Sequence, residues 1–476
     1  MIAGLLLFLV LPLVMGGTVY ALRRWATLSA LLSVGMSVAL GLMILVLPLG
    51  RTIEIWGRQI VMGGTLSFLG RELILEDVDR VAMAFLYLTA SGTFLLAWQT
   101  SPGSLLFPVG FGVLSLFSGS LLIRPLIYAV LLFEIAVAIS VFGLQAEGGR
   151  PGKGALQYLS FSLLGMPGLL VIHWLMDRYA LTPDNTGLRD TAAGLLALSF
   201  MLLMGGTPFH WWMPAVADDG EPMAGAFAFS VNHAAVWFLL LGFLETYPDI
   251  AAYGRFGPLV AGVGLAMIGV GGVLAAAQRR PGRILGYAVL ADSGAALVAL
   301  GLSSEAGLAL ALLCILSRPF GVLLMAAGIR GLKDRRRDLG WRAGSARGLV
   351  TEAPWSTLAF LIGGLSIAGL PITAGFAARW SLYRGLGRAG LVAVLLMMAA
   401  SLGVMIGVWR VLSVVMAEWE PEDVKRGELG RVEREGWARG TVVLVGVVAC
   451  VVVGLVPQAL APTASRLAGL YTFLVR

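Results

Sequence analysis

The chain has 476 residues, of which 58% are hydrophobic and only 13% are charged, and its formal net charge is +7. Soluble domains are usually about 45–50% apolar and about 25% charged, so this composition excludes an ordinary soluble protein. Membrane proteins carry an excess of arginine and lysine on their cytoplasmic loops, and we read the positive charge in this way rather than as a nucleic-acid signal. Cys314 and Cys450 both lie in apolar runs, which indicates small buried side chains rather than a disulfide or a metal site.

Long apolar runs follow one another along the whole sequence. A membrane-spanning helix needs about 20 mostly apolar residues, and we predict an all-α polytopic membrane protein with about fourteen transmembrane helices in a single domain over residues 1–476. The first run lacks a charged leading segment and an obvious cleavage site, which favours a retained helix over a signal peptide. The predicted spans are 2–22, 26–49, 80–99, 104–123, 125–144, 155–176, 189–211, 222–244, 253–277, 283–303, 305–331, 353–384, 388–417 and 440–459.

The connections between the spans predict the orientation of the chain. Residues 51–56 and 72–76 alternate in a strand-like way, which indicates a small hairpin on the outer face within the 50–79 connection. Arginine and lysine are more frequent in the odd-numbered connections, so we place these in the cytoplasm and both chain termini on the outer face of the cell (inner) membrane. The bases that carry this orientation are Arg23, Arg24, Arg150, Lys153, Arg279, Arg280, Arg283, Arg330, Lys333, Arg335, Arg336, Arg337, Arg342, Arg347, Lys425, Arg426, Arg431, Arg434 and Arg439.

Two predicted spans contain helix-breaking residues. The span over 189–211 ends in a segment with Pro208, His210 and Pro214, and the span over 353–384 contains Gly369 and Pro371. Proline removes a backbone donor and glycine loosens the helix. Broken backbone at membrane depth is tolerated where protein or a water-filled cavity covers it, and a pair of broken helices is typical of ion sites in transporters. The alternative for each segment is an ordinary proline kink, and we expect His210 to satisfy backbone groups that its break sets free.

Five ionisable residues lie inside apolar runs: Glu134, His233, Asp292, Arg318 and Arg379. A charge at the centre of a membrane helix costs at least about 2.5–3.5 kcal/mol, so such residues face inward and usually mark an ion or proton path. Structural alternatives stay open for each. Glu134 can be a carboxylic acid bonded to backbone, His233 a packing residue, Asp292 with Arg318 a static buried pair, and Arg379 a base that reaches toward the membrane surface.

Several motifs, taken in order, resemble one family. Pro208-Phe-His-Trp-Trp-Met-Pro214 and the following His233-Ala-Ala-Val-Trp237 helix, then Arg283-Ile-Leu-Gly-Tyr287, Ser366-Ile-Ala-Gly-Leu-Pro371 with Arg379, and Gly454-Leu-Val-Pro457 all have counterparts there. The family contains the antiporter-like membrane subunits of respiratory complex I (NADH:quinone oxidoreductase), of group 4 membrane-bound hydrogenases and of Mrp-type Na⁺/H⁺ antiporters. The resemblance covers nearly the whole chain and indicates a shorter paralogue without a lateral helix.

The resemblance implies a fold and a function. It implies fourteen helices with two inverted five-helix repeats and discontinuous seventh and twelfth helices. The peripheral helices would lie in 1–103, the repeats in 104–277 and 283–417, and the last helix and tail in 440–476. The implied function is proton translocation, or cation/proton antiport, by a membrane-arm subunit in a lipid bilayer beside other subunits. The chain shows no redox motif, so any quinone, iron–sulfur or flavin chemistry would belong to partners, and whether the chain counts as part of an enzyme stays open.

The family's proton relay can be carried over one residue at a time. Glu134 matches the family's glutamate in the fifth helix, and His233 falls on a lysine position of the eighth. Arg379 falls on the lysine or glutamate position of the twelfth helix, while Asp292 and Arg318 lie near other relay positions. The seventh-helix lysine falls on Leu203, so the family's glutamate–lysine pair is incomplete here. Histidine can exchange protons near neutral pH, whereas arginine keeps its proton.

Three functions therefore remain open. The first is a proton-translocating subunit of a complex I or group 4 hydrogenase-type machine with an altered relay. The second is an Mrp-type cation/proton antiporter subunit or a bicarbonate-uptake membrane subunit. The third is a structural spacer that kept the fold and lost pumping, which the leucine at position 203 favours.

Overall fold

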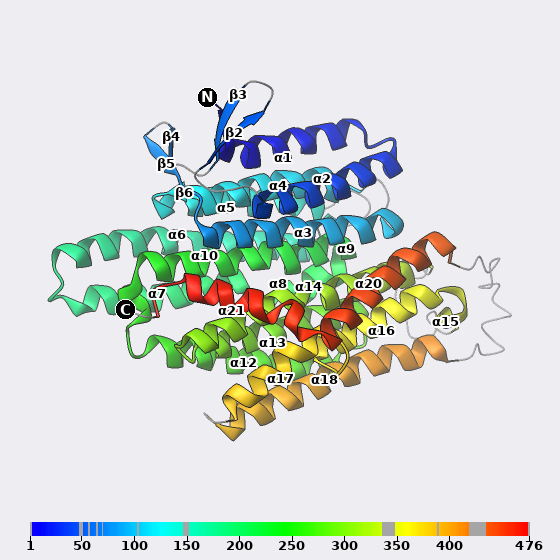
Figure 1. Cartoon of the computed structure of the whole chain (residues 1–476). Helices are drawn as coiled ribbons and strands as arrows, with labels where there is room; N and C mark the ends of the chain where they lie inside the picture. The colour runs from blue at the N-terminus through cyan, green and yellow to red at the C-terminus, as the bar shows by residue number, and fades with distance from the viewer. Residues whose placement is uncertain are drawn as a thin grey trace.

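Long apolar helices run side by side through the described part of the chain and form one bundle (Figure 1). The computed structural model describes residues 2–46, 51–55, 58–62, 65–68, 70–101, 104–145, 152–335, 348–387, 390–417 and 435–474. Among these residues, eleven helices are long and apolar enough to cross a membrane, and three shorter apolar helices accompany them. The all-α polytopic fold predicted from the sequence is thus confirmed. Some bases used to orient the chain lie outside the described residues: Arg150, Arg336, Arg337, Arg342, Arg347, Lys425, Arg426, Arg431 and Arg434.

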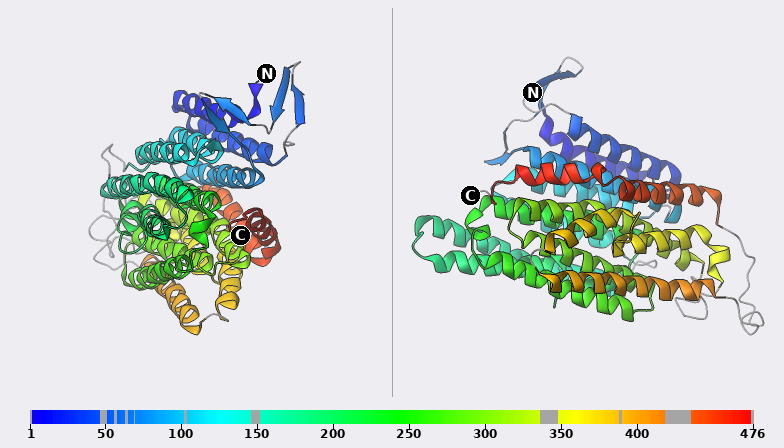
Figure 2. Two further views of the ribbon diagram at one scale, coloured as in Figure 1. Left: turned by 90° about the vertical axis from the view of Figure 1, so that its left-hand side faces the viewer. Right: turned by 60° about the horizontal axis from the view of Figure 1, so that its bottom comes forward.

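The N-terminal helices stack on one side of the bundle, as the end view shows (Figure 2). They are α1 (Gly4–Ala21), α2 (Ala26–Val46), α3 (Asp77–Thr100), α4 (Leu106–Leu122) and α5 (Leu126–Gly143). The connection between α2 and α3 carries short strands, and β2 (Arg51–Ile55) pairs antiparallel with β3 (Arg58–Met62). The other strands are β1 (Ile2–Ala3), β4 (Leu66–Phe68), β5 (Arg71–Leu73) and β6 (Ile123–Arg124), which form the orders β1-β3-β2 and β4-β5-β6.

The rest of the chain forms the larger part of the bundle. Its first elements are α6 (Lys153–Leu181), α7 (Thr186–Met204), α8 (Trp212–Asp219), α9 (Pro222–Phe227), the π-helix η1 (Ala228–Asn232), α10 (His233–Thr246), α11 (Pro248–Ala251) and α12 (Phe256–Ala277). The later elements are α13 (Pro281–Leu300), α14 (Glu305–Asp334), α15 (Leu349–Glu352), α16 (Pro354–Ala368), α17 (Ala374–Leu386), α18 (Leu391–Met416), α20 (Trp437–Leu455), the short η3 (Pro457–Ala459) and α21 (Ala461–Leu470).

Three segments form the protein interior. The most apolar windows of Pro222–Thr246, α13 and α14 are 94%, 89% and 83% buried, whereas the windows of α2, α12 and α18 are 39% buried or less. A helix that is apolar all round is one that neighbours surround. Buried ionisable side chains on these central segments therefore meet protein rather than lipid.

The chain does not end its helical path at the last predicted span. After η3, which begins at Pro457, the chain forms α21, and α21 packs against α14 and α3 with Ala464 and Leu467 buried. The sequence signal missed α21 because its ten residues are less apolar than a spanning helix. Both termini lie at the same end of the bundle (Figure 1), which we name the terminal face.

Candidate functional site

Four ionisable side chains from four different helices form one buried chain. The Arg318 Nε on α14 donates to Asp292 Oδ2 on α13 at 2.7 Å, and Arg379 Nη2 on α17 donates to Asp292 Oδ1 at 3.3 Å. Arg318 Nη1 also lies 3.3 Å from His233 Nδ1, at the start of α10. The ion pair expected between Asp292 and Arg318 is present, and the structure extends it on both sides. We name these four residues the charge chain.

The charge chain is deeply buried and holds unequal charges. Its members are 2–8% exposed, from His233 at 2% to Asp292 at 8%. Two guanidinium groups share one carboxylate, so the chain carries one excess positive charge when the histidine is neutral. Arg318 Nη2 and the Nε and Nη1 of Arg379 find no hydrogen-bond partner among the described residues. Burial of unpaired charge is costly, so this excess needs a further stabilising group or bound water.

The geometry indicates where the proton of a neutral His233 lies. A guanidinium nitrogen can only donate, so Nδ1 facing Arg318 must accept, and the ring proton is then on Nε2. The ring approaches the carbonyl of Met204, at the end of α7, without the geometry of a hydrogen bond. Of the four residues, the histidine is the one that can take up and release a proton near neutral pH through either ring nitrogen.

A wide turn places His233 in the chain. The five residues of η1 form a π-helix directly before α10, and such turns rotate the following side chains relative to an α-helix. Asn232, the last residue of this turn, donates from Nδ2 to the Tyr158 hydroxyl of α6 at 3.2 Å. The amide thereby holds its own side chain toward α6, while the next residue meets Arg318. No feature of the sequence alone signals this turn.

Both expected helix breaks are present. Helix α7 ends at Met204 and α8 begins at Trp212, while α16 ends at Ala368 and α17 begins at Ala374. Gly205 and Gly369 end the first halves with φ of +68° and +80°, a left-handed conformation that glycine adopts without strain.

The second break positions Arg379. A Cβ atom on Gly369 would lie only 2.4 Å from the Arg379 Cγ, so the arginine packs directly over this glycine. The C-terminal end of a helix carries partial negative charge, and the end of α16 therefore favours a cation at this place. This interaction offsets part of the excess charge of the chain.

We expect the Gly369→Ala variant to lower the free energy of unfolding by about 1–2 kcal/mol, because alanine is strained in the left-handed conformation. Its Cβ would also displace Arg379. The measurement is the unfolding midpoint in detergent. Gly262→Ala is the matched control, since a Cβ at this exposed position of α12 meets nothing within 4 Å. An equal midpoint for both variants would contradict the role of Gly369.

The other break residues have packing roles. His210 is buried and stacks on Trp211 with ring centroids 4.9 Å apart, but neither of its ring nitrogens has a hydrogen-bond partner among the described residues. The expectation that it satisfies freed backbone groups is therefore wrong. Pro214 of α8 packs against Gly286 of α13, and Pro371 is exposed between α16 and α17. Pro208 lies within the first break.

Glu134 does not join the charge chain. It is half-buried on α5, and the described residues provide it with no hydrogen bond or ion pair. The expectation of a deeply buried glutamate is wrong within this single chain, because the surface of α5 that carries residues 134 and 135 is not covered by another helix.

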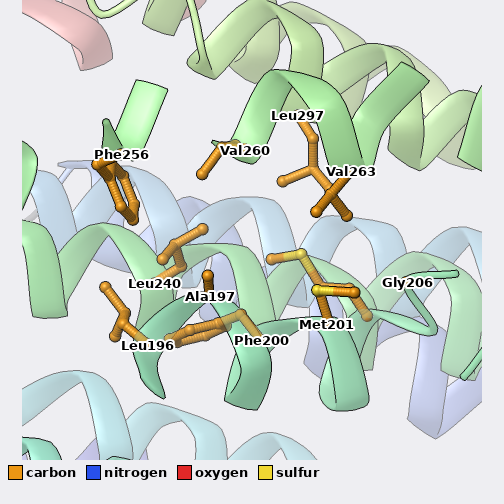
Figure 3. A pocket seen from close by; sticks show the side chains of 11 residues that line it. Leu196, Ala197, Phe200, Met201, Gly206, Leu240, Phe256, Val260, Val263 and Leu297 are labelled. Carbon is orange, nitrogen blue, oxygen red and sulfur yellow. The ribbon is translucent and has the colours of Figure 1, made fainter. Parts of the chain in front are cut away.

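Leu203 and its surroundings are apolar. The leucine is 1% exposed and packs toward Gly165 of α6. A cavity of about 30 Å³ beside the end of α7 is lined by apolar side chains, with Phe200 and Met201 among them (Figure 3). Apolar cavities of this kind stay dry. This part of α7 therefore offers no group that could exchange a proton.

The fold and the site together define a class. A bundle of apolar helices, two of them broken, that encloses a chain of ionisable side chains is an antiporter-like membrane subunit. The chain belongs to the NADH:quinone oxidoreductase/Mrp antiporter transmembrane family, whose model matches residues 152–407. This confirms the resemblance found in the sequence.

Individual relatives come from both branches of the family. The chain is 27% identical over 300 residues to an NADH-quinone oxidoreductase membrane subunit of Rhodococcus opacus (strain B4), a match that covers 62% of this chain and 54% of that protein. It is 29% identical over 306 residues to a probable K⁺/H⁺ antiporter protein of Rhizobium meliloti (strain 1021), a match that covers 56% of each. These matches span about half the length of the curated relatives. A protein in the Mrp complex of Dietzia sp. DQ12-45-1b shares the fold, with a TM-score of 0.80, 18% identity and coverage of 98% of this chain and 97% of that chain.

Proposed function

We propose that this chain is an ion-translocating membrane subunit of a larger assembly and that the charge chain carries out its part in transport. The observation that supports this most is the continuous link from His233 on α10 through Arg318 and Asp292 to Arg379 on α17, next to a broken helix. Intramembrane ionisable residues in contact with one another are typical of proton relays.

The charge chain suggests an electrostatic mechanism. When His233 binds a proton, its ring and the Arg318 guanidinium become two cations in contact. Two unit charges 4 Å apart interact by about 4 kcal/mol at an effective dielectric constant of 20. The repulsion drives Arg318 toward Asp292 and away from the ring, and release of the proton restores the contact. Arg318 and Arg379 act here as movable charges, because arginine keeps its proton.

The relatives suggest the kind of assembly. Membership of the family is compatible with a membrane-arm subunit of a complex I-type machine, in which partner subunits supply the redox energy, and with an Mrp-type cation/proton antiporter. In either case the ions are protons or Na⁺ and the partners are other membrane subunits. A structural spacer is the second candidate function, and the apolar surroundings of Leu203 favour it.

The triple variant Asp292→Leu, Arg318→Met and Arg379→Met separates a pump from a spacer. Replacing a buried ion-pair network by apolar residues of similar volume is often neutral for stability. We therefore expect the assembly to form and its proton transport in sealed vesicles to fall by at least about tenfold, because His233 would lose its coupled charge. Transport equal to the wild type, with the variant shown to be incorporated, would contradict the pump and support the spacer.

A further inference from the structure

A second cavity lies at the terminal face, away from the charge chain. It has a volume of about 180 Å³ and lies between the first turn of α3, the end of α4 with β6, one face of α10, and the end of α21. Unlike the cavity beside α7, its lining is mixed, with ionisable side chains as well as apolar ones. A polar cavity of this size holds water.

The mouth of the cavity carries net negative charge. Glu76, Asp79 and Glu245 line it together with a single base, Arg124, whose Nη2 lies 3.7 Å from Asp79 and 3.8 Å from Glu76. Three carboxyl groups against one guanidinium favour cations over anions in a confined space.

A buried tyrosine hydroxyl points to a ligand in this mouth. Tyr471 is 5% exposed, lines the cavity and lies near the three carboxyl groups. The described residues give its hydroxyl no hydrogen bond, although a buried phenol usually has one. Glu245 holds the chain beside the ring, since it accepts from the backbone nitrogens of Thr472 at 2.8 Å and Phe473 at 3.2 Å. The C-terminal segment is thereby fixed with the tyrosine in the mouth.

The cavity reaches the middle of the bundle along α10. Ala235, Phe238, Leu239 and Gly242 line it at the spacing of one helix face. Ten residues separate Ala235 from Glu245, which corresponds to about 15 Å along a helix and to half of a hydrocarbon core about 30 Å thick. One turn beyond Ala235 lies Asn232, whose Oδ1 has no partner among the described residues and which directly precedes His233.

We propose that this cavity is an aqueous half-channel that admits hydrated monovalent cations, protons included, from the terminal face to the middle of α10, with Tyr471 as its gate. The carboxyl groups of Glu76, Asp79 and Glu245 select the sign of the charge. The half-channel deepens the proposed function and rests on it for its role in transport, but water access along α10 can be measured independently of transport.

Cysteine labelling tests the half-channel in the full chain within its membrane assembly. In a background with Cys314 and Cys450 replaced by serine and alanine, the Ala235→Cys and Gly242→Cys variants are treated with membrane-impermeant cationic and anionic thiol reagents in vesicles of both orientations. We expect both positions to react from the terminal face, with the cationic reagent at least about tenfold faster. The Ala234→Cys variant is the matched control, because Ala234 is equally buried on α10 and does not line the cavity.

Additional variants test the gate and the selectivity. Tyr471→Ala is expected to accelerate labelling of the Ala235→Cys variant, and Glu245→Gln combined with Asp79→Asn to remove the preference for the cationic reagent. Lack of reaction at both lining positions, or equal reaction of the Ala234→Cys control, would overturn the half-channel. Normal labelling together with unchanged transport in the triple variant of the charge chain would instead overturn the proposed function alone. Addition of Na⁺ or K⁺ at constant pH that slows labelling would indicate that metal cations enter as well as protons.

Discussion

The Asp292→Leu variant is expected to lose about 3–5 kcal/mol of the free energy of unfolding, because it leaves Arg318 and Arg379 buried without their shared counter-charge. The two guanidinium groups belong to residues that are 5% and 4% exposed, so water cannot replace the carboxylate without opening the bundle. Their donor distances of 2.7 Å and 3.3 Å to the two oxygens of Asp292 show that each arginine depends on it. The measurement is the unfolding midpoint of the purified chain in detergent, followed by tryptophan fluorescence.

Two further variants show whether the loss comes from unpaired charge. The triple variant that also replaces Arg318 and Arg379 by methionine is expected to recover most of the stability, since no buried charge remains. Asp77→Leu serves as the control for removal of a carboxylate, because Asp77 pairs with Arg80 at the surface with 63% of its side chain exposed. An exposed pair of this kind contributes about 0–1 kcal/mol. A triple variant less stable than the single one would contradict the account.

The His233→Gln variant is expected to lower proton transport by at least about tenfold while the assembly stays intact. Glutamine can still accept a hydrogen bond from Arg318, so the contact that positions the arginine is retained. It cannot bind a proton near neutral pH, so the step that separates His233 from Arg318 is lost. The measurement is proton uptake or release by sealed vesicles that contain the complete assembly, normalised to the amount of incorporated chain.

The other two histidines of the chain provide internal controls. His173 contacts the Tyr247 hydroxyl near one end of α6, and His210 stacks on Trp211 at the first break. Neither belongs to the charge chain, so His173→Gln and His210→Gln are expected to leave the transport rate within about twofold of the wild type. Equal losses for all three variants would indicate a general effect of histidine replacement on packing and would contradict the assignment of His233.

The sequence predicts the helices, the breaks and the unusual residues, but not which side chains meet. Gly369 and Pro371 announce a break because their backbone chemistry acts locally. The contacts of the charge chain join residues that are 26, 85 and 87 positions apart, and no local pattern encodes such pairing. The expected pair of Asp292 and Arg318 was therefore only half of the arrangement, and the contact with Arg379 was missed.

Helices that are apolar on all sides conceal which face is buried. Glu134 and Asp292 lie in similar apolar runs, yet α5 leaves Glu134 half-buried whereas α13 is enclosed. In soluble proteins the contrast between apolar and polar faces tells the two situations apart, but lipid and protein interiors are equally apolar. The rotation of a membrane helix is set by its neighbours, and it becomes visible only once they are in place.

The break at Gly369 has a mechanical consequence. Helix α17 is a short rod of 13 residues that is joined to α16 through five non-helical residues and carries Arg379 on its inner side. A neighbouring subunit that pushed on this rod would draw a fixed positive charge toward or away from Asp292, and the change would reach His233 through Arg318. The half-helix thus works as an electrical lever, in which displacement at the edge of the bundle becomes a change of potential at its centre.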